Sequence, residues 1–251
     1  MTRSRLVKIL EYMYVHNLVT VEELVTLTGS SASTIRRDLA LLARRGSVIR
    51  IHGGATLSRY VPAQPSTEEK SLQSRNEKER IGRAAAALLK EDSSVIMDAG
   101  TTTLEIARSI PDMPLTVFTP DLRIALTLSA LSKLNIELTG GALDHASQSC
   151  VGSRCVIFTK ELIPSVCFIA CNAWSLEYGI MTPSSEKLEL KQAMLKAPAL
   201  KVLVADSSKY GARAMCRVCD IKDLDCIVTD AGLPDDVTSE IEKAGVRVVR
   251  A

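Results

Sequence analysis

Four short segments of the chain combine glycines, hydroxyl groups and charged side chains that suit the binding of a small anion. They are Asp98–Thr103, Thr139–Gly141, Cys171–Asn172 and Asp206–Gly211. Gly100 lets the backbone approach an anion, and the three threonines after it offer N–H and O–H donors where a helix would begin. Lys209 adds a positive charge, and the carboxylates of Asp98 and Asp206 can accept from sugar hydroxyls. The combination predicts a site for a small phosphorylated polyol.

Each segment follows a short apolar run that predicts a β-strand, and helical patterns alternate with these runs. This alternation is typical of an α/β fold with a largely parallel sheet. In such sheets ligands bind at the carboxyl ends of the strands, which would bring the four segments together. A Gly-Thr-Thr sequence alone is more often an ordinary helix start, so the prediction depends on all four segments. The expected strands are Ser94–Met97, Leu115–Phe118, Asn135–Leu138, Ser165–Ala170, Lys201–Ala205, Cys226–Val228 and Arg247–Val249.

The amino-terminal part shows the pattern of a winged helix-turn-helix. Thr20 and Glu23 predict a capping box at the start of one helix, and Gly29 can end it. Ser30 or Ser31 can cap the next helix, whose apolar positions recur at helical spacing. A strand over residues 47–51 and a turn over residues 52–54 would form the wing. The apolar positions expected to build the small core are Leu6, Ile9, Leu10, Met13, Ile35, Leu39 and Leu42.

The outward face of the second helix and the wing carry groups that suit the major groove of DNA. Arginine can donate two hydrogen bonds to O6 and N7 of guanine, and short hydroxyl side chains can approach phosphates or base edges. For Arg36 and Arg37 alone, an ordinary solvated helix face stays open as the alternative. The order of helix, turn, helix and wing favours binding of duplex DNA. The residues expected to contact it are Ser31, Ser33, Thr34, Arg36, Arg37, Arg44, Arg50 and His52.

The distribution of charge also separates the winged helix-turn-helix pattern from the rest of the chain. Residues 1–60 hold nine Lys and Arg against four Asp and Glu, a net charge of +5, which leaves −3 for the remainder. Only the basic part has the sign that attracts DNA phosphates. Pro62 and Pro65 then interrupt regular structure, and a charged stretch precedes an alanine-rich helix expected from Arg80 to Lys90. We therefore expect a DNA-binding domain over residues 1–58, a linker over 59–79 and a ligand-binding domain over 80–251.

Composition excludes several classes of protein. No apolar run approaches the roughly 18–20 residues of a membrane span, and the amino-terminal pattern lacks a secretory apolar segment. Seven cysteines, an odd number, fit free thiols in the cytoplasm better than a disulfide framework. Cys216 and Cys219 are spaced like a metal or redox pair, but neither a second pair nor a spaced histidine completes a zinc site. We expect no cofactor, no metal and no membrane contact.

Over nearly its full length the chain resembles the DeoR family of bacterial transcriptional repressors. The motifs that carry the resemblance are Ser33–Leu39, Arg50–Ala55, Asp98–Thr103, Gly140–Gly141, Val151–Gly152, Lys191–Met194 and Ala205–Gly211. The resemblance implies a sensor domain similar in fold to ribose-5-phosphate isomerase and glucosamine-phosphate deaminase, used for binding without turnover. It also implies a phosphorylated sugar as effector, an operator DNA and a homo-oligomer, either a dimer or a tetramer.

The strand-end segments and the resemblance together select the ligand-binding residues. They are Asp98, Gly100, Thr101, Thr102, Thr103, Gly140, Gly141, Asn172, Lys191, Asp206 and Lys209. The chain departs from the family pattern at three points. It has Thr119–Pro120 where the family commonly has Thr-Asn, and Ala170–Ala173 where the family usually has Gly-Ala-Asp-Gly. The acidic residue that usually precedes the Lys191 segment is either Glu186 or displaced by Lys187. These departures predict an unusual ligand or a weakened site.

Two functions from different classes remain. The first is a repressor of a sugar-metabolism operon that a phosphorylated sugar releases from its operator. The second is a sugar-phosphate isomerase or deaminase with a fused DNA-binding head. Isomerisation needs a base near C1 and C2 and a group that polarises the substrate oxygen. Side chains that can supply these are Asp98, Glu186, Asp206 and Lys209. No second acid-plus-lysine motif lies beyond the phosphate-site segments, so we favour a regulator that is not an enzyme.

Overall fold

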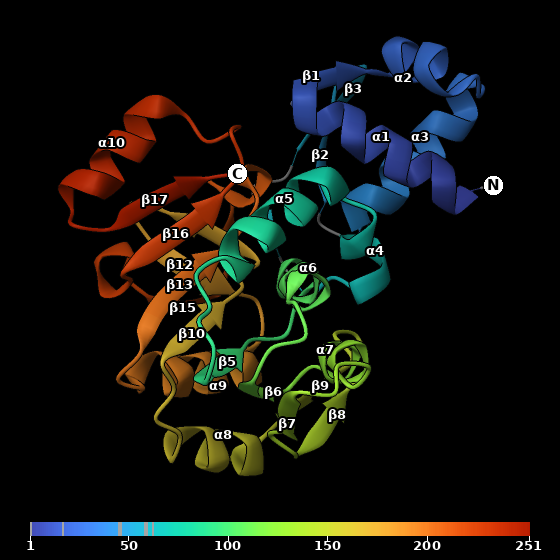
Figure 1. Ribbon diagram of the computed structural model, residues 1–251. Helices are drawn as coiled ribbons and strands as arrows, with labels where there is room; N and C mark the ends of the chain where they lie inside the picture. The colour runs from blue at the N-terminus through green and yellow to red at the C-terminus, as the bar shows by residue number, and fades with distance from the viewer. Residues whose placement is uncertain (1, 17, 45–46, 58–59, 62) are drawn as a thin grey trace.

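The structure, a computed structural model, describes residues 2–16, 18–44, 47–57, 60–61 and 63–251 (Figure 1). A smaller amino-terminal lobe, drawn in blue, lies against a larger α/β lobe that holds the rest of the chain. Residue 58, where we predicted the end of the first domain, and Pro62 of the predicted linker lie outside the described residues.

The smaller lobe is a winged helix-turn-helix. Its helices are α1 (Thr2–His16), α2 (Val21–Thr28) and α3 (Ala32–Arg44), and its sheet has the order β1 (Leu18–Thr20), β3 (Gly54–Leu57), β2 (Val48–Ile51). The capping box of Thr20 and Glu23 forms, and Gly29 ends α2 in the left-handed conformation. All seven predicted core positions are buried. These predictions are confirmed, whereas β1 was not predicted because three residues carry too little periodicity.

An ion pair joins the first and third helices of this lobe. Arg5 Nε lies 2.6 Å from Asp38 Oδ2, and Arg5 Nη2 donates to Asp38 Oδ1 at 3.2 Å. Asp38 is only 4% exposed, so the acid of α3 faces the lobe interior and not the solvent. This bidentate ion pair holds α3 against α1, because the planar guanidinium and the carboxylate match in shape.

The larger lobe is built on a seven-stranded sheet in which every neighbouring pair is parallel. Its order is β17 (Arg247–Arg250), β16 (Cys226–Thr229), β13 (Leu200–Val204), β10 (Val166–Ile169), β5 (Ser93–Met97), β6 (Leu115–Thr119), β7 (Leu134–Leu138). The seven predicted strands are these strands, each matched to within one residue at either end. The predicted parallel α/β sheet is therefore confirmed.

Helices cover both faces of this sheet. Side chains alternate between the faces, so Val95 and Met97 of β5 pack on one side and Ile96 on the other. The first side carries α5 (Arg75–Ala86), α6 (Thr101–Ser109) and α7 (Leu122–Leu128). The second side carries α8 (Ser153–Lys160), α9 (Ser185–Lys196) and α10 (Asp235–Lys243). No helix of the described residues is long and apolar enough to span a membrane.

Short elements at the ends of the main strands were not predicted. They are an antiparallel sheet of β11 (Ala173–Ser175), β12 (Gly179–Thr182) and β15 (Cys216–Cys219), a hairpin of β8 (Ala142–Asp144) and β9 (Ser149–Val151), and the turns η1 (Ser207–Lys209) and η2 (Ile221–Asp223). Each is only three or four residues long, too short for a sequence pattern to reveal. The β8–β9 hairpin matters below because its side chains reach the candidate site.

The segment between the lobes is more ordered than we predicted. It contains β4 (Tyr60–Val61), which pairs with β14 (Arg213–Ala214), and the short helix α4 (Thr67–Ser71). The helix expected at Arg80–Lys90 begins five residues earlier and ends at Ala86. The charged composition of this stretch hid its buried face, which includes Lys78 and Ile81. The segment is therefore attached to the sensor lobe along much of its length.

Candidate functional site

The predicted DNA-contacting residues of α3 lie on its exposed side. Ser33, Arg36 and Arg37 are exposed, and Ser31 caps the helix by accepting from the Thr34 N–H at 3.3 Å. The hydroxyl of Ser31 also bonds those of Ser33 and Thr34. Because Asp38 is turned inward, these two arginines are not neutralised by the acid of their own helix. A helix N-terminus with hydroxyls and exposed guanidinium groups suits a DNA groove.

The wing adds two more of the predicted contacts. Arg50 on β2 and His52 in the β2–β3 turn are exposed. A left-handed Gly53 makes this tight turn, in which Ile51 pairs with Gly54 across the hairpin. The side chain of Arg44 lies outside the described parts of the chain. The structure therefore brings the α3 and wing residues onto the exposed surface of one small lobe.

A narrow hollow lies at the carboxyl ends of β5 and β10. The loops that line it are residues 99–102 and 170–172, together with Gln64 and four lysines, Lys70, Lys187, Lys191 and Lys209. Its volume is about 20 Å³, enough for about one water molecule. No Asp or Glu is among the described residues that line it. A sugar phosphate would therefore meet positive charge here, but only after the walls move apart.

The amino end of α6 forms one wall of the hollow. The first N–H groups of a helix have no partner within it and carry partial positive charge. Gly100 N–H is held by Asp121 Oδ2 at 3.2 Å, and Thr103 Oγ donates back to Gly100 O at 2.9 Å. The hydroxyl of Thr102 is buried and has no partner among the described residues. This wall offers unused donors to an anion.

Asp98 and Lys191 form a buried ion pair behind that wall. Asp98 Oδ1 accepts from the Ala99 N–H at 2.8 Å, and Oδ2 accepts from the Ala170 N–H at 3.0 Å and pairs with Lys191 Nζ. Lys191 Nζ also donates to Ala170 O at 2.6 Å. Asp98 therefore joins the loops after β5 and β10. It does not line the hollow, although Lys191 does.

Asp206 and Lys209 are arranged in a similar way. Asp206 is 2% exposed, accepts from the Ser208 hydroxyl and lies 3.6 Å from Lys209 Nζ. Burial raises the pKa of Asp206, but Lys209, Lys78 and the Ser208 hydroxyl outweigh this effect and lower it. Asp206 is therefore ionised and committed to neighbours of its own. Lys209 is the member of this pair that reaches the hollow.

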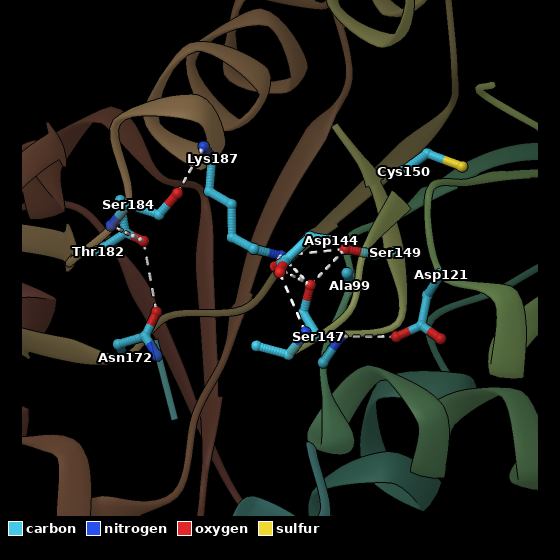
Figure 2. Close-up of polar contacts among 12 residues, drawn as sticks. Ala99, Asp121, Asp144, Ser147, Ser149, Cys150, Asn172, Thr182, Ser184 and Lys187 are labelled. Atoms are coloured by element: carbon cyan, nitrogen blue, oxygen red, sulfur yellow. Dashed lines mark hydrogen bonds and ion pairs between the residues drawn. The ribbon is translucent and has the colours of Figure 1, made fainter. Parts of the chain in front are cut away.

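Lys187 occupies the inward position at the start of α9, and Glu186 is exposed. Lys187 Nζ donates to Ser147 Oγ at 2.7 Å and to Ser149 Oγ at 3.0 Å, both on the β8–β9 hairpin. It also lies 3.5 Å from Asp144 Oδ2. Figure 2 shows the side chain extending from α9 to these three residues. Burial and Lys191 lower the pKa of Lys187, against the opposing effects of Asp98 and Asp144.

Lys70 and Gln64 line the hollow although both lie in the segment predicted as a linker. Burial, together with the nearby cations Lys187, Lys209, Lys191 and Arg123, lowers the pKa of Lys70 to about 7. Gln64 Oε1 is buried without a partner among the described residues. The capping box of Ser66 and Glu69 could have located α4 in the sequence. Nothing in the sequence shows that α4 packs on this site.

The structure brings most of the predicted ligand residues together. Those that line the hollow are Gly100, Thr101, Thr102, Asn172, Lys191 and Lys209, and those that support it from behind are Asp98, Thr103 and Asp206. Gly140 and Gly141 lie between β7 and β8, are exposed and do not line it. A Cβ at Gly141 would lie 2.4 Å from Val151 O, so this glycine is needed for close packing of the hairpin.

Two departures from the family pattern have visible local roles. Pro120 O accepts the Cys150 N–H at 2.8 Å, which attaches β9 to the end of β6. Asn172 Oδ1 accepts from the Thr182 hydroxyl at 3.4 Å (Figure 2). The described residues contain no group of three or more His, Cys, Asp or Glu that could hold a metal ion. The seven cysteines, including Cys216 and Cys219, are free thiols.

Comparison with known proteins matches both lobes. Residues 5–60 match the DeoR-like helix-turn-helix domain, and residues 73–231 match the DeoR C terminal sensor domain. The chain belongs to the DeoR family. It is a DNA-binding transcriptional regulator, with a small-molecule sensor domain attached to its helix-turn-helix.

Relatives match along almost the entire chain. An HTH-type transcriptional regulator of Haemophilus influenzae is 35% identical over 92% of this chain and 91% of its own length. The regulator YgbI of Escherichia coli K12 is 36% identical over 97% and 95%. A putative aga operon transcriptional repressor of Escherichia coli O157:H7 is 31% identical over 99% and 93%. The names of these relatives describe regulators of transcription.

Solved structures are less similar. Ribose 5-phosphate isomerase A from Methanocaldococcus jannaschii aligns with a TM-score of 0.41 and 10% identity, over 55% of each chain. A similarity of this size has no bearing on what the sensor domain binds.

Proposed function

We propose that this DeoR-family regulator represses a sugar-metabolism operon and that a phosphorylated sugar releases it from its operator. The observation that supports the proposal is the hollow beside the α6 N-terminus, which four lysines line. A phosphate fits such a place because N–H donors, helix dipole and ammonium groups act on it together. The repressor of the aga operon among the relatives points to the same kind of role.

The proposed DNA complex contains at least two heads. One recognition helix covers too few base pairs to select an operator, so a dimer or tetramer would place two α3 helices on half-sites whole helical turns apart. The predicted contacts on α3 and the wing stand as part of this proposal. We place its action in the cytoplasm, together with the operator.

The segment between the lobes provides a route from effector to DNA. It contributes Gln64 and Lys70 to the hollow, and it continues directly from the wing strand β3. A ligand larger than one water must displace these side chains. A ligand shifts an equilibrium only by its differential affinity for the two states. We infer that the effector prefers an arrangement in which the segment, and with it the head, has moved.

The sensor domain is proposed to bind its ligand without turning it over. Isomerisation requires a base beside C1 and C2, and the nearby carboxylates of Asp98 and Asp206 are held by lysines and hydrogen bonds outside the lining. Sustained conversion of ribose 5-phosphate or glucosamine 6-phosphate by the purified protein would overturn this part of the proposal.

Operator binding in the presence of candidate effectors tests the proposal. Duplexes selected from random DNA by the full-length protein would be titrated by fluorescence anisotropy with ribose 5-phosphate, glucose 6-phosphate, fructose 1-phosphate and 6-phosphogluconate. At least one should weaken operator binding by about 5- to 150-fold. Lys209→Ala should bind the operator normally but lose this response, whereas the exposed Lys222→Gln should keep it. If no phosphorylated compound acts, or Lys209→Ala responds like the parent, the effector site is wrong.

A further inference from the structure

The walls of the hollow consist mostly of hydrogen-bond donors. An ammonium group has three donors and no acceptor, and four of them line the space. The lining side chains that can accept are the amide oxygens of Gln64 and Asn172 and the hydroxyls of Thr101 and Thr102. Of these, Asn172 Oδ1 already accepts from Thr182. The hydroxyl protons of a neutral polyol would find few partners here, so the walls suit a ligand rich in acceptors.

The donors gather at two separate places. At one, the α6 N-terminus adjoins Lys191, whose Nζ is held by Asp98 and Ala170. At the other, Lys187 Nζ contacts Ser147 and Ser149 of the β8–β9 hairpin. Lys187 and Lys191 are four residues apart on α9, which corresponds to a rise of about 6 Å. Two anionic groups of a four- to six-carbon chain can be separated by such a distance.

The two buried lysines are unfavourable neighbours in an empty site. Like charges at i and i+4 on a helix repel, and burial removes water that would screen them. Lys70 adds a third ammonium group, whose pKa is lowered by burial and by the charges of Lys187, Lys209, Lys191 and Arg123. Two polar atoms of the lining, Thr102 Oγ1 and Gln64 Oε1, are buried without partners among the described residues. Lys187, Lys191 and Lys209 each have a carboxylate partner, but none of those carboxylates is among the described residues that line the hollow. Four ammonium groups and the unused Thr102 hydroxyl therefore favour an anionic occupant with more than one charged end.

The surroundings of Lys187 select the kind of anion. Its single charge is already partly neutralised by Asp144 Oδ2 at 3.5 Å. A second phosphate, with nearly two negative charges at neutral pH, would be repelled by this carboxylate. A carboxylate on the ligand carries one charge and can accept from the ammonium group and the two serine hydroxyls.

We propose that the effector is a phosphorylated sugar acid of four to six carbons. Its phosphate lies at the α6 N-terminus with Lys191 and Lys209, and its carboxylate is bound by Lys187 with Ser147 and Ser149. The inference rests on the proposed effector site and specifies the chemistry of its ligand. Lys187 is the residue that distinguishes a sugar acid from a sugar of the same length.

Calorimetry on the full-length protein tests this with ligands matched in length. 6-Phosphogluconate would be compared with glucose 6-phosphate, with 4-phosphoerythronate as a shorter acid and fructose 1,6-bisphosphate as a ligand with two phosphates. An acid should bind about tenfold or more tightly than glucose 6-phosphate, the effect of one charge-assisted interaction. Lys187→Gln should reduce this ratio to nearly one, and Lys222→Gln should leave it unchanged.

The outcomes separate this inference from the proposed function. If glucose 6-phosphate binds as tightly as both acids and weakens operator binding, the effector site stands and the sugar-acid inference is overturned. The sugar-acid inference is also overturned if the bisphosphate binds most tightly, or if Lys187→Gln keeps the full ratio of the affinity for the acid to that for glucose 6-phosphate. If no phosphorylated compound binds, the proposed function itself fails. Thermal unfolding will show whether Lys187→Gln folds. If it does not, the sugar-acid inference is judged from the ratio of the two affinities, for the acid and for glucose 6-phosphate, measured on the unaltered protein.

Discussion

Asp98 joins two loops of the sensor domain through three interactions, with two backbone N–H groups and the ammonium group of Lys191. Both side chains of the pair are only 4% exposed. If one partner is removed, the other charge stays buried without compensation, which typically costs about 3–5 kcal/mol. We therefore expect Asp98 to influence effector binding through the loops that it holds.

Asp98→Asn should lower the free energy of unfolding by about 3–5 kcal/mol. Urea denaturation followed by circular dichroism measures this, with the exposed Glu242→Gln as a matched control. A loss of effector response in Asp98→Asn would then report on folding as well as binding. An unfolding free energy within about 0.5 kcal/mol of the parent would contradict the structural role.

Effector binding should depend on pH through Lys70. Burial, together with the positive charges of Lys187, Lys209, Lys191 and Arg123, lowers its pKa to about 7. An anionic ligand favours the protonated form, so binding takes up a proton above that pKa and affinity falls as pH rises from about 7 to 9. A phosphate ester is already doubly charged there, since its second pKa is about 6.

Calorimetry in buffers of different ionisation enthalpy measures this proton uptake directly. Lys70→Arg should flatten the pH profile, because the guanidinium stays charged over the whole range. A parent protein whose affinity is constant over this range would show that Lys70 does not contact the ligand.

The chemistry of the site was only partly predictable from single residues. Gly100 and the threonines were found because a helix start after a strand has a local pattern. Lys70 and Lys187 were not selected as ligand residues, because their positions depend on how α4 and α9 pack on distant loops. The carboxylates of Asp98 and Asp206 were expected to face the ligand, and the structure instead pairs each with a lysine.

At the scale of elements, α3 presents the arginines on which operator recognition is proposed to depend. Arg36→Ala or Arg37→Ala should weaken specific DNA binding by about 1–3 kcal/mol if the side chain contacts a base. Gel-shift titration of each variant on the selected operator and on random duplex measures this, with Arg108→Ala as a control at an exposed arginine of the other lobe. Unchanged binding in both variants would refute the assigned face of α3.

The long elements were predictable and the short ones were not. The strands of the parallel sheet have four or five residues with apolar side chains at most positions, and their composition and flanking turns are local. The edge strands β7 and β17 are more exposed and carry polar or charged residues. The strands β4, β8, β11 and β14 have only two or three residues. β4 and β14 pair with each other although they are far apart in the sequence, and β8 and β11 pair with the next strand in short hairpins. In α5, Lys78 is buried although lysine is usually exposed, so the charge pattern placed the start of that helix five residues too late.

At the scale of the whole molecule, α4 is held between the two parts of the sensor lobe that meet at the hollow. Thr67 N–H donates to Ala146 O of the β8–β9 loop at 2.9 Å. Lys78 Nζ donates to the carbonyls of Lys70 and Gln73 at 2.5 and 2.6 Å. The position of Lys70 beside the hollow is thus fixed by bonds to both the hairpin and α5.

Lys78→Met should uncouple the effector from the operator. The variant keeps the apolar stem of the side chain but loses both carbonyl bonds, so α4 no longer follows the state of the hollow. We expect operator binding close to that of the parent and a response to effector below about fivefold, the lower end of ordinary coupling. Anisotropy with and without ligand gives the ratio, and Lys90→Met at an exposed position serves as control. A full response in Lys78→Met would exclude α4 as the route.

The small volume of the hollow has a consequence for the speed of the response. With room for about one water, the site cannot admit a sugar phosphate by diffusion alone, and Gln64 and Lys70 must first move. Association then contains a unimolecular opening step, so the observed rate should level off as ligand concentration rises. Once the effector is concentrated enough for this rate to level off, the time in which a cell could derepress its operon would be set by the opening of a five-residue helix.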